Sequence, residues 1–194
     1  MSTLVIVIIA LVVICFLYIL KIQRQLVGLD EKMKNALGQI NTQIKSRWDA
    51  VTALVQMTKQ YSAHEHDTLT DVIRERRGTV TSASDVNAQN EAINSVLGRL
   101  IAVAEQYPDL KANDMFKNTM DGIKGYEENV RLSRMVYNDA VTKLNVLIRQ
   151  WPSSIVAGML HFTPQAYIEE EKGKTSMPDI ESIFNGNSGK PQAE

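Results

Sequence analysis

The sequence predicts an all-α protein in which an N-terminal transmembrane helix continues into a long antiparallel, up-and-down bundle of three or four helices. Three observations support this fold class. A charge-free apolar run occupies most of the first 20 residues, later apolar residues recur at helical spacing, and no proline precedes Pro108. A long stretch of chain is therefore free of the residue that most strongly breaks helices. We expect a transmembrane anchor at 1–20, a helical bundle at 21–171 and a disordered tail at 172–194.

The composition disfavours several classes of protein. The chain has 21 Lys and Arg against 22 Asp and Glu, a net charge of -1, so we expect no nucleic-acid partner. The single cysteine, Cys15, cannot form an intrachain disulfide or a Cys-rich metal site. The sequence offers no nucleophile beside a base, no glycine-rich phosphate loop and no paired carboxylates at a pocket. We therefore expect no enzymatic activity, no catalytic residues and no cofactor.

The apolar run from Leu4 to Leu20 contains no charged residue. With Thr3 it would form about 27 Å of helix at 1.5 Å per residue, close to the roughly 30 Å of a bilayer core. A cleaved signal peptide would need a basic start and a small-residue cleavage site, whereas only Met-Ser-Thr precedes the run and Lys21 follows it. We predict an uncleaved, single-pass anchor.

The flanks of the anchor predict its orientation. The N-terminal side has no Lys or Arg, and the basic residues on the other side are Lys21, Arg24, Lys32 and Lys34, mixed with Asp30 and Glu31. Positive charge favours the cytoplasmic side. We therefore expect the bulk of the chain in the cytoplasm.

Apolar residues after the anchor recur in steps of three and four, with a mean of about 3.6, the period of an α-helix. This seam consists of Leu26, Leu29, Met33, Leu37, Ile40, Ile44, Trp48, Val51 and Val55. We expect the anchor to continue directly into a first helix that ends near Tyr61.

A second leg is predicted from His64, with a break at Gly78. Ser84 or Asp85 would cap its continuation, which ends at 107–109 because Pro108 disfavours helix there. Whether this break makes three helices or four is left open by the sequence.

A third leg is predicted from 109–112 to Pro152, with its apolar positions in the heptad register of a coiled coil. The seam consists of Phe116, Met120, Ile123, Val130, Tyr137, Val141, Leu144, Ile148 and Trp151. A short segment at 153–161 and a last turn at 165–171 would follow. The apolar island at 177–184 would belong to the tail or act as a docking peptide.

The same register places Glu127 and Arg134 on the apolar face of the third leg. We expect Arg134 to pair with an acidic residue on another helix, and Glu127 to pair with Arg131 at i,i+4 spacing. A polar groove that binds a peptide or a small anion is the functional alternative. The candidate structural or interaction residues are Glu127, Glu128, Asn129, Arg134, Tyr137, Asn138, Asn145 and Trp151.

The segment His64-Glu65-His66-Asp67 is the one dense cluster of metal-ligating residue types. Zinc-protease helices use histidines four residues apart, whereas these two are two apart and would point about 200° apart around a helix. We expect a solvated turn here and no metal site.

Several motifs together resemble the LemA family. Glu128-Asn129, Arg134, Tyr137-Asn138, Asn145 and Trp151-Pro152 follow its C-terminal signature; 107–113 matches its Y-P-D-L-K-A-N turn, and 48–65 the end of its first helix. The resemblance covers roughly residues 3–171. One departure is the missing proline in 49–55. The resemblance implies a single-pass bacterial inner-membrane protein with an antiparallel helical bundle, and it implies no activity.

We therefore expect a non-enzymatic, membrane-anchored scaffold or adaptor that acts through protein–protein interaction or self-assembly. Its expected partners are the membrane, an unidentified protein and, as a homo-oligomer, further copies of itself. Two alternatives are a membrane-remodelling protein and a ligand- or metal-binding component that uses the regions of Arg134 and His64–His66.

Overall fold

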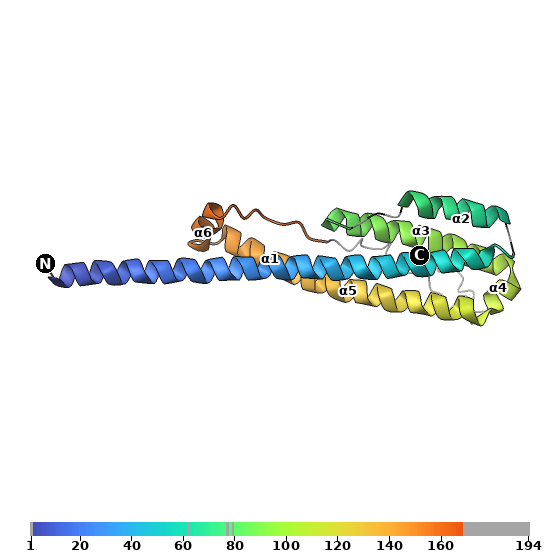
Figure 1. The fold of residues 1–194 in the computed structure, drawn as a ribbon, viewed down its shortest axis with the longest axis horizontal. Helices are drawn as coiled ribbons and strands as arrows, with labels where there is room; N and C mark the ends of the chain where they lie inside the picture. The colour runs from blue at the N-terminus through green and yellow to red at the C-terminus, as the bar shows by residue number, and fades with distance from the viewer. Residues whose placement is uncertain (1, 62, 77, 79, 169–194) are drawn as a thin grey trace, which may run out of the picture. The chain divides into compact units, whose positions relative to one another are not determined.

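The computed structural model describes residues 2–61, 63–76, 78 and 80–168, and all regular structure within them is helical (Figure 1). The helices are α1 (Ser2–Thr58), α2 (Ala63–Arg76), α3 (Ala83–Gln106), α4 (Pro108–Ala112), α5 (Asp114–Arg149) and α6 (Ser153–Met159). The predicted all-α class and long apolar N-terminal helix are confirmed. The predicted tail at 172–194, with its island at 177–184, lies outside the described residues.

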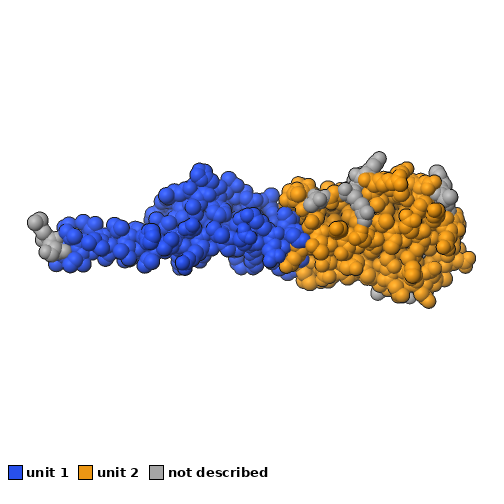
Figure 2. Space-filling model, in the orientation of Figure 1, with its two compact units in different colours: residues 1–38, 133–167 blue, residues 39–132, 168–194 orange. Residues whose placement is uncertain are grey.

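The helices belong to two compact units (Figure 2). Unit 1 contains residues 1–38 and 133–167, and unit 2 contains residues 39–132 together with Ile168. The first part of α1 and the second part of α5 therefore lie in unit 1, and their other parts lie in unit 2.

Unit 2 contains segments of α1 and α5 together with α2 and α3 in an up-and-down arrangement, and the short α4 connects α3 to α5 (Figure 1). The Val80 amide donates to Asn41 Oδ1 (3.2 Å) and the Trp48 indole donates to Gln89 Oε1 (2.7 Å), so residue numbers in α1 and α3 rise together and these helices are parallel. The chain reverses once between Thr58 and Ala63, so α2 runs antiparallel to α1, and it reverses again at the break predicted at Gly78, before α3. Of the predicted alternatives of three or four helices, this unit therefore has four in its up-and-down arrangement, with α4 as a short connection.

A capping box starts α3. The N-cap is Ser82, which corrects the predicted Ser84 or Asp85. The Asp85 amide donates to Ser82 Oγ (3.3 Å), and Asp85 Oδ2 accepts from the amides of Thr81 and Ser82 (both 2.9 Å) and from the Thr81 hydroxyl (2.8 Å). Hydrogen bonds from Thr81, then Ser82, lower the pKa of Asp85 to about 2. The correct cap lies earlier because Asp85 occupies the N3 position of the box.

Proline positions match the ends of helices. α3 ends at Gln106, and Pro108 occupies the first position of the short α4, where its missing amide costs no hydrogen bond. α5 then begins at Asp114, later than predicted, because Asn113 Oδ1 accepts from the amides of Met115 (2.9 Å) and Phe116 (3.2 Å).

Unit 1 combines the first part of α1 with the second part of α5, α6 and the chain that follows α6. From the predicted seam of α1, Leu26 and Met33 are buried and Leu29 and Leu37 are half-buried in this unit. Lys32 of α1 forms an ion pair with Asp139 of α5 (3.3 Å), which also accepts from Lys143 (2.9 Å). The N-terminal stretch of α1 projects beyond the rest of the unit as a single helix (Figure 2).

Two predictions for unit 1 are wrong. Trp151 was expected in the apolar seam, but 76% of it is exposed, because α5 ends at Arg149 and the helical register stops before Trp151. A helical turn was expected from residue 165, but the described residues 162–168 are not helical. Hydrogen bonds between α5 and the backbone of residues 165 and 166 hold this segment in a non-helical conformation.

Candidate functional site

The eight candidate residues lie on α5 or directly after it, and they are divided between the two units. Those in unit 2 are Glu127, Glu128 and Asn129; those in unit 1 are Arg134, Tyr137, Asn138, Asn145 and Trp151. Glu127 belongs to a polar cluster in unit 2, and Tyr137 and Asn145 belong to another in unit 1.

The cluster in unit 2 is centred on Arg47, an α1 residue that the sequence analysis did not single out. Arg47 is 1% exposed. Its Nη1 donates to Asn90 Oδ1 (2.7 Å) and its Nη2 to Asn94 Oδ1 (3.1 Å), both on α3. The same Nη2 lies 3.6 Å from Glu127 Oε2 of α5. One guanidinium thus joins three helices of this unit.

Arg47 could have been found by widening the predicted seam of α1, to which Ile40, Ile44 and Val51 already belong. Ile40, Ile44, Val51, Leu54 and Thr58 are buried, and Arg47 falls between them at steps of three and four. A helix that is surrounded by several others buries a wider stripe than a single seam. An arginine inside that wider stripe is a signal for a buried polar contact.

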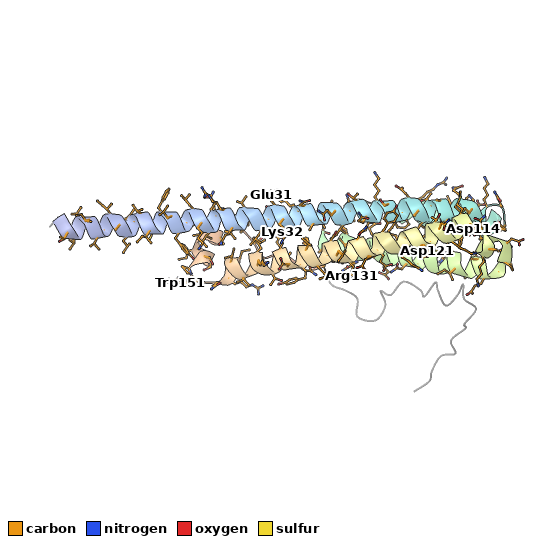
Figure 3. All side chains as sticks on the ribbon, turned by 90° about the horizontal axis from the view of Figure 1, so that it is seen from below. Glu31, Lys32, Asp114, Asp121, Arg131 and Trp151 are labelled. Atoms are coloured by element: carbon orange, nitrogen blue, oxygen red, sulfur yellow. The ribbon has the colours of Figure 1, made fainter. Side chains whose placement is uncertain are left out.

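Neighbouring glutamates on α5 have different partners. Glu127 is half-buried and faces Arg47, while Glu128 is exposed and accepts from Arg131 Nε (2.8 Å) and Nη2 (2.6 Å). The predicted Glu127–Arg131 pair is therefore wrong, because Glu127 turns to α1. The hydrogen bonds from Arg131 lower the pKa of Glu128. Arg131 lies on the outer side of α5 (Figure 3), and Asn129 is exposed.

Arg134 is buried, at 8% exposure, as its heptad position predicts. An ion pair of the kind predicted for it, between a buried arginine and an acidic residue of another helix, is formed in unit 2 by Arg47 and Glu127.

The cluster in unit 1 holds the chain that follows α6. The Asn145 amide donates to the Gln165 carbonyl (2.9 Å), and Asn145 Oδ1 accepts from the Gln165 amide (2.8 Å). The Tyr137 hydroxyl donates to the Ala166 carbonyl (3.3 Å), and burial raises the pKa of Tyr137. Asn138, half-buried, accepts from the Thr142 hydroxyl through its carbonyl (2.8 Å). Asn145 and Tyr137 thus fix an extended segment against α5.

A shallow, open groove of about 390 Å³ lies beside this clamp. It is lined by Thr142, Asn145, Val146, Arg149, Gln150 and Tyr167. Its polar lining includes one cationic side chain, that of Arg149. Trp151, next in the chain, is exposed at the same end of α5 (Figure 3).

The His64–Asp67 segment lies in the first turns of α2, not in a turn between helices as predicted. His66 Nδ1 is 3.0 Å from the Val55 carbonyl oxygen of α1. Across the described part of the chain, no three His, Cys, Asp or Glu side chains converge in a way that could hold a metal ion. Arg134 belongs to unit 1 and this segment to unit 2.

The polar contacts are of two kinds. The contacts of Arg47, Asn145 and Tyr137 each join one segment to another segment of the same unit, whereas Glu128–Arg131 and Thr142–Asn138 lie within α5. Buried contacts of the first kind specify which helices and segments pack together. We therefore look for function on the exposed surfaces of the helices.

The described residues include one helix, α1, that is long and apolar enough to cross a membrane, and its most apolar window is fully exposed in the structure. In a soluble core helix such a window would be buried.

Known proteins resemble parts of this chain. Magnetosome proteins MamQ 1 and MamQ 2 of Paramagnetospirillum magneticum are each 34% identical to it over 77 residues, and MamQ of Magnetospirillum gryphiswaldense is 31% identical over 77 residues. The match covers 40% of this chain and 28% of the length of each relative. The sequence pattern of the LemA family matches residues 36–181, which include the helices of unit 2 and both polar clusters. Because this match extends over most of the chain, the protein belongs to the LemA family.

Proposed function

We propose that this protein is a non-enzymatic scaffold or adaptor that α1 anchors in a bacterial inner membrane and that acts by binding another protein or further copies of itself. LemA membership, the likeness to magnetosome proteins and the apolar helix are consistent with a membrane-associated helical protein. The scaffold role and the partners are our proposal.

The observation that supports it best is the continuity of α1. Residues 3–19 of this helix are exposed and apolar in large part, whereas Ile22, Leu26 and Met33 are buried in unit 1. One uninterrupted helix, Ser2–Thr58, therefore contains both the membrane-spanning candidate and core residues of the fold. A rigid connection of this kind suits a protein that holds a surface close to a bilayer.

We also propose that the bulk of the chain lies in the cytoplasm, because the basic residues Lys21 and Arg24 follow the apolar stretch on the side of the folded units. A reporter enzyme fused after Glu194 tests this orientation. Reporter activity on the cytoplasmic side is expected, and activity confined to the other side would overturn the orientation.

The partner is best sought by crosslinking in living cells followed by mass spectrometry of the purified full chain. The proposal expects a reproducible crosslink to one protein, or to a second copy, from exposed lysines such as Lys45 or Lys59. A strictly monomeric protein across concentrations in detergent, without a reproducible crosslink in cells, would contradict the scaffold role.

A further inference from the structure

A group of large apolar side chains is exposed at the end of unit 1 formed by α6. Trp151, Ile155 and Met159 are 76%, 57% and 69% exposed, and Leu160 follows them at 40%. We call these four residues the α6 apolar face. Ile155 and Met159 are four residues apart and so share one side of α6. Large apolar side chains that are exposed together on one side of a short helix indicate a contact with a protein or a membrane.

The opposite side of α6 is fixed to the unit. Ser153, Val156 and Ala157 are buried, and the Ser153 hydroxyl donates to the carbonyls of Leu147 and Gln150 (both 2.8 Å). The Asn145 clamp then holds the chain after α6 at Gln165. The α6 apolar face is therefore held outward by the fold.

The segment of chain that carries this face contains no charged side chain. From Gln150 to Ile168 the sequence contains no Asp, Glu, Lys or Arg, and its one histidine is the exposed His161. An apolar face without a charged side chain in it can enter the headgroup and upper acyl region of a bilayer without desolvating an ion.

The position of α6 within unit 1 points to the same occupant. Both views show α6 beside α1, at the end of the unit toward the projecting N-terminal stretch (Figures 1 and 3). Along α1, residues 3–19 are exposed and Ile22 is the first buried residue. The covered part of α1 thus begins where the apolar stretch ends and Lys21 and Arg24 supply charge for lipid phosphates.

We propose that the α6 apolar face lies in the interfacial region of the bilayer that α1 enters, with Trp151 at headgroup level. Tryptophan favours this depth because its ring is apolar and its indole N–H is polar. The protein would then hold the membrane at two points, a spanning helix and an interfacial face, which restricts its tilt. This inference rests on the membrane anchor of the proposed function.

Tryptophan fluorescence tests the inference directly, because the chain has two tryptophans and Trp48 is buried in unit 2. The full chain is reconstituted into vesicles of phosphatidylethanolamine and phosphatidylglycerol, with or without acyl chains brominated close to the headgroups. In the Trp48→Phe variant all tryptophan emission comes from Trp151, and in the Trp151→Phe variant it comes from Trp48. We expect bromolipids to quench Trp151 at least about twofold more than Trp48. If Trp48→Phe does not fold, the emission of Trp151 is obtained by subtracting the emission of Trp151→Phe from that of the wild type.

A second set of variants tests the face itself in the Trp48→Phe background. Ile155→Ser with Met159→Ser should lower the quenching of Trp151 while the protein still floats with the vesicles. Met115→Ser, a change at an exposed apolar residue of unit 2, is the matched control and should leave the quenching unchanged.

The outcomes separate this inference from the proposed function. Flotation with equal, weak quenching of both tryptophans would overturn the interfacial face and leave the anchor standing. Trp151 emission that shifts with protein concentration but is insensitive to bromolipid would show that a second copy covers the face, and would also overturn the inference. Failure of the wild type to float would overturn the anchor and this inference together.

Discussion

The two units satisfy their buried polar groups in different ways. In unit 2 the guanidinium of Arg47 is met by side chains of α3 and α5. In unit 1 the amide of Asn145 and the hydroxyl of Tyr137 are met by backbone groups of residues 165 and 166. Side-chain partners specify which helices pack together, whereas backbone partners hold a segment that has no helix of its own. The same helix, α5, serves both purposes along its length.

From this comparison we expect the largest loss of stability when Arg47 is replaced. Arg47→Ala leaves Glu127 and two asparagines without the cation that they surround, so we expect a loss of about 3 kcal/mol or more in the free energy of unfolding, measured by denaturant titration. Arg47→Lys keeps the charge but not the forked geometry, and should fall between Ala and the wild type. Lys45→Ala, at an exposed position of the same helix, is the control and should stay within about 0.5 kcal/mol. A similar stability for Arg47→Ala and Lys45→Ala would contradict the role of the cluster.

Replacing Asn145 should cause a smaller loss of stability, confined mainly to the segment that follows α6. Asn145→Ala removes both hydrogen bonds to Gln165, which should cost about 1–2 kcal/mol. Hydrogen exchange should accelerate at the Gln165 amide more than in α3. The matched control is Asn118→Ala at an exposed position of α5. Unchanged protection of Gln165 would show that the clamp does not hold the segment.

Loss of the N-cap of α3 should have the next largest effect on stability. Ser82→Ala removes the side-chain acceptor of the capping box and should cost about 1 kcal/mol by thermal or denaturant unfolding. Ser95→Ala, an exposed change within α3, should have a smaller effect. An equal effect of the two substitutions would argue against the cap.

Acid should weaken the same cap. The pKa of Asp85 is about 2 in the folded chain against an ordinary 3.8. Because folding lowers this pKa, the carboxylate stabilises the fold above the ordinary value, and that contribution is lost as the pH falls toward the folded value. The melting temperatures of wild type and Asp85→Asn should therefore differ at neutral pH and converge on acidification. A difference that stays constant down to the lowest pH measured would refute this linkage.

The exposed Glu128–Arg131 pair should show the smallest effect. Both side chains are about half exposed, and exposed ion pairs contribute little because water screens them. We expect Arg131→Ala to leave the unfolding midpoint unchanged within error, in contrast to Arg47→Ala. A large loss of stability in Arg131→Ala would contradict the conclusion that the Glu128 pair contributes much less than the Glu127 contact with Arg47.

Much of the fold follows from local patterns. The seam of α1 is buried or half-buried throughout, the break at Gly78 separates α2 from α3, and Pro108 and Pro152 stand at or just beyond helix ends. The local sequence patterns gave wrong positions for two helix ends, the start of α3 and the end of α5. Ser82 became the cap because Asp85 completes its box, and Trp151 left the seam because α5 ends before it.

The candidate site was harder to predict from periodicity. The heptad register placed Glu127 and Arg134 on the inner side of α5, and the structure buries Arg134 and half-buries Glu127. It gave no indication that the partner of Glu127 would come from α1, 80 residues earlier in the chain. The contact of Asn145 with Gln165 was equally hidden, because both partners look like ordinary polar residues in sequence.

By itself, the sequence determined the helical class, the apolar stretch of α1, the inward faces of the long helices and the resemblance to the LemA family. Helical spacing and helix-breaking residues are local properties, and each can be evaluated within a few turns of chain. Only the tertiary structure decided the number of helices in unit 2, the enclosure of Arg47, the clamp on residues 165–166 and the outward α6 apolar face. These features depend on which surfaces meet after the chain reverses direction, and that depends on packing between residues far apart in sequence.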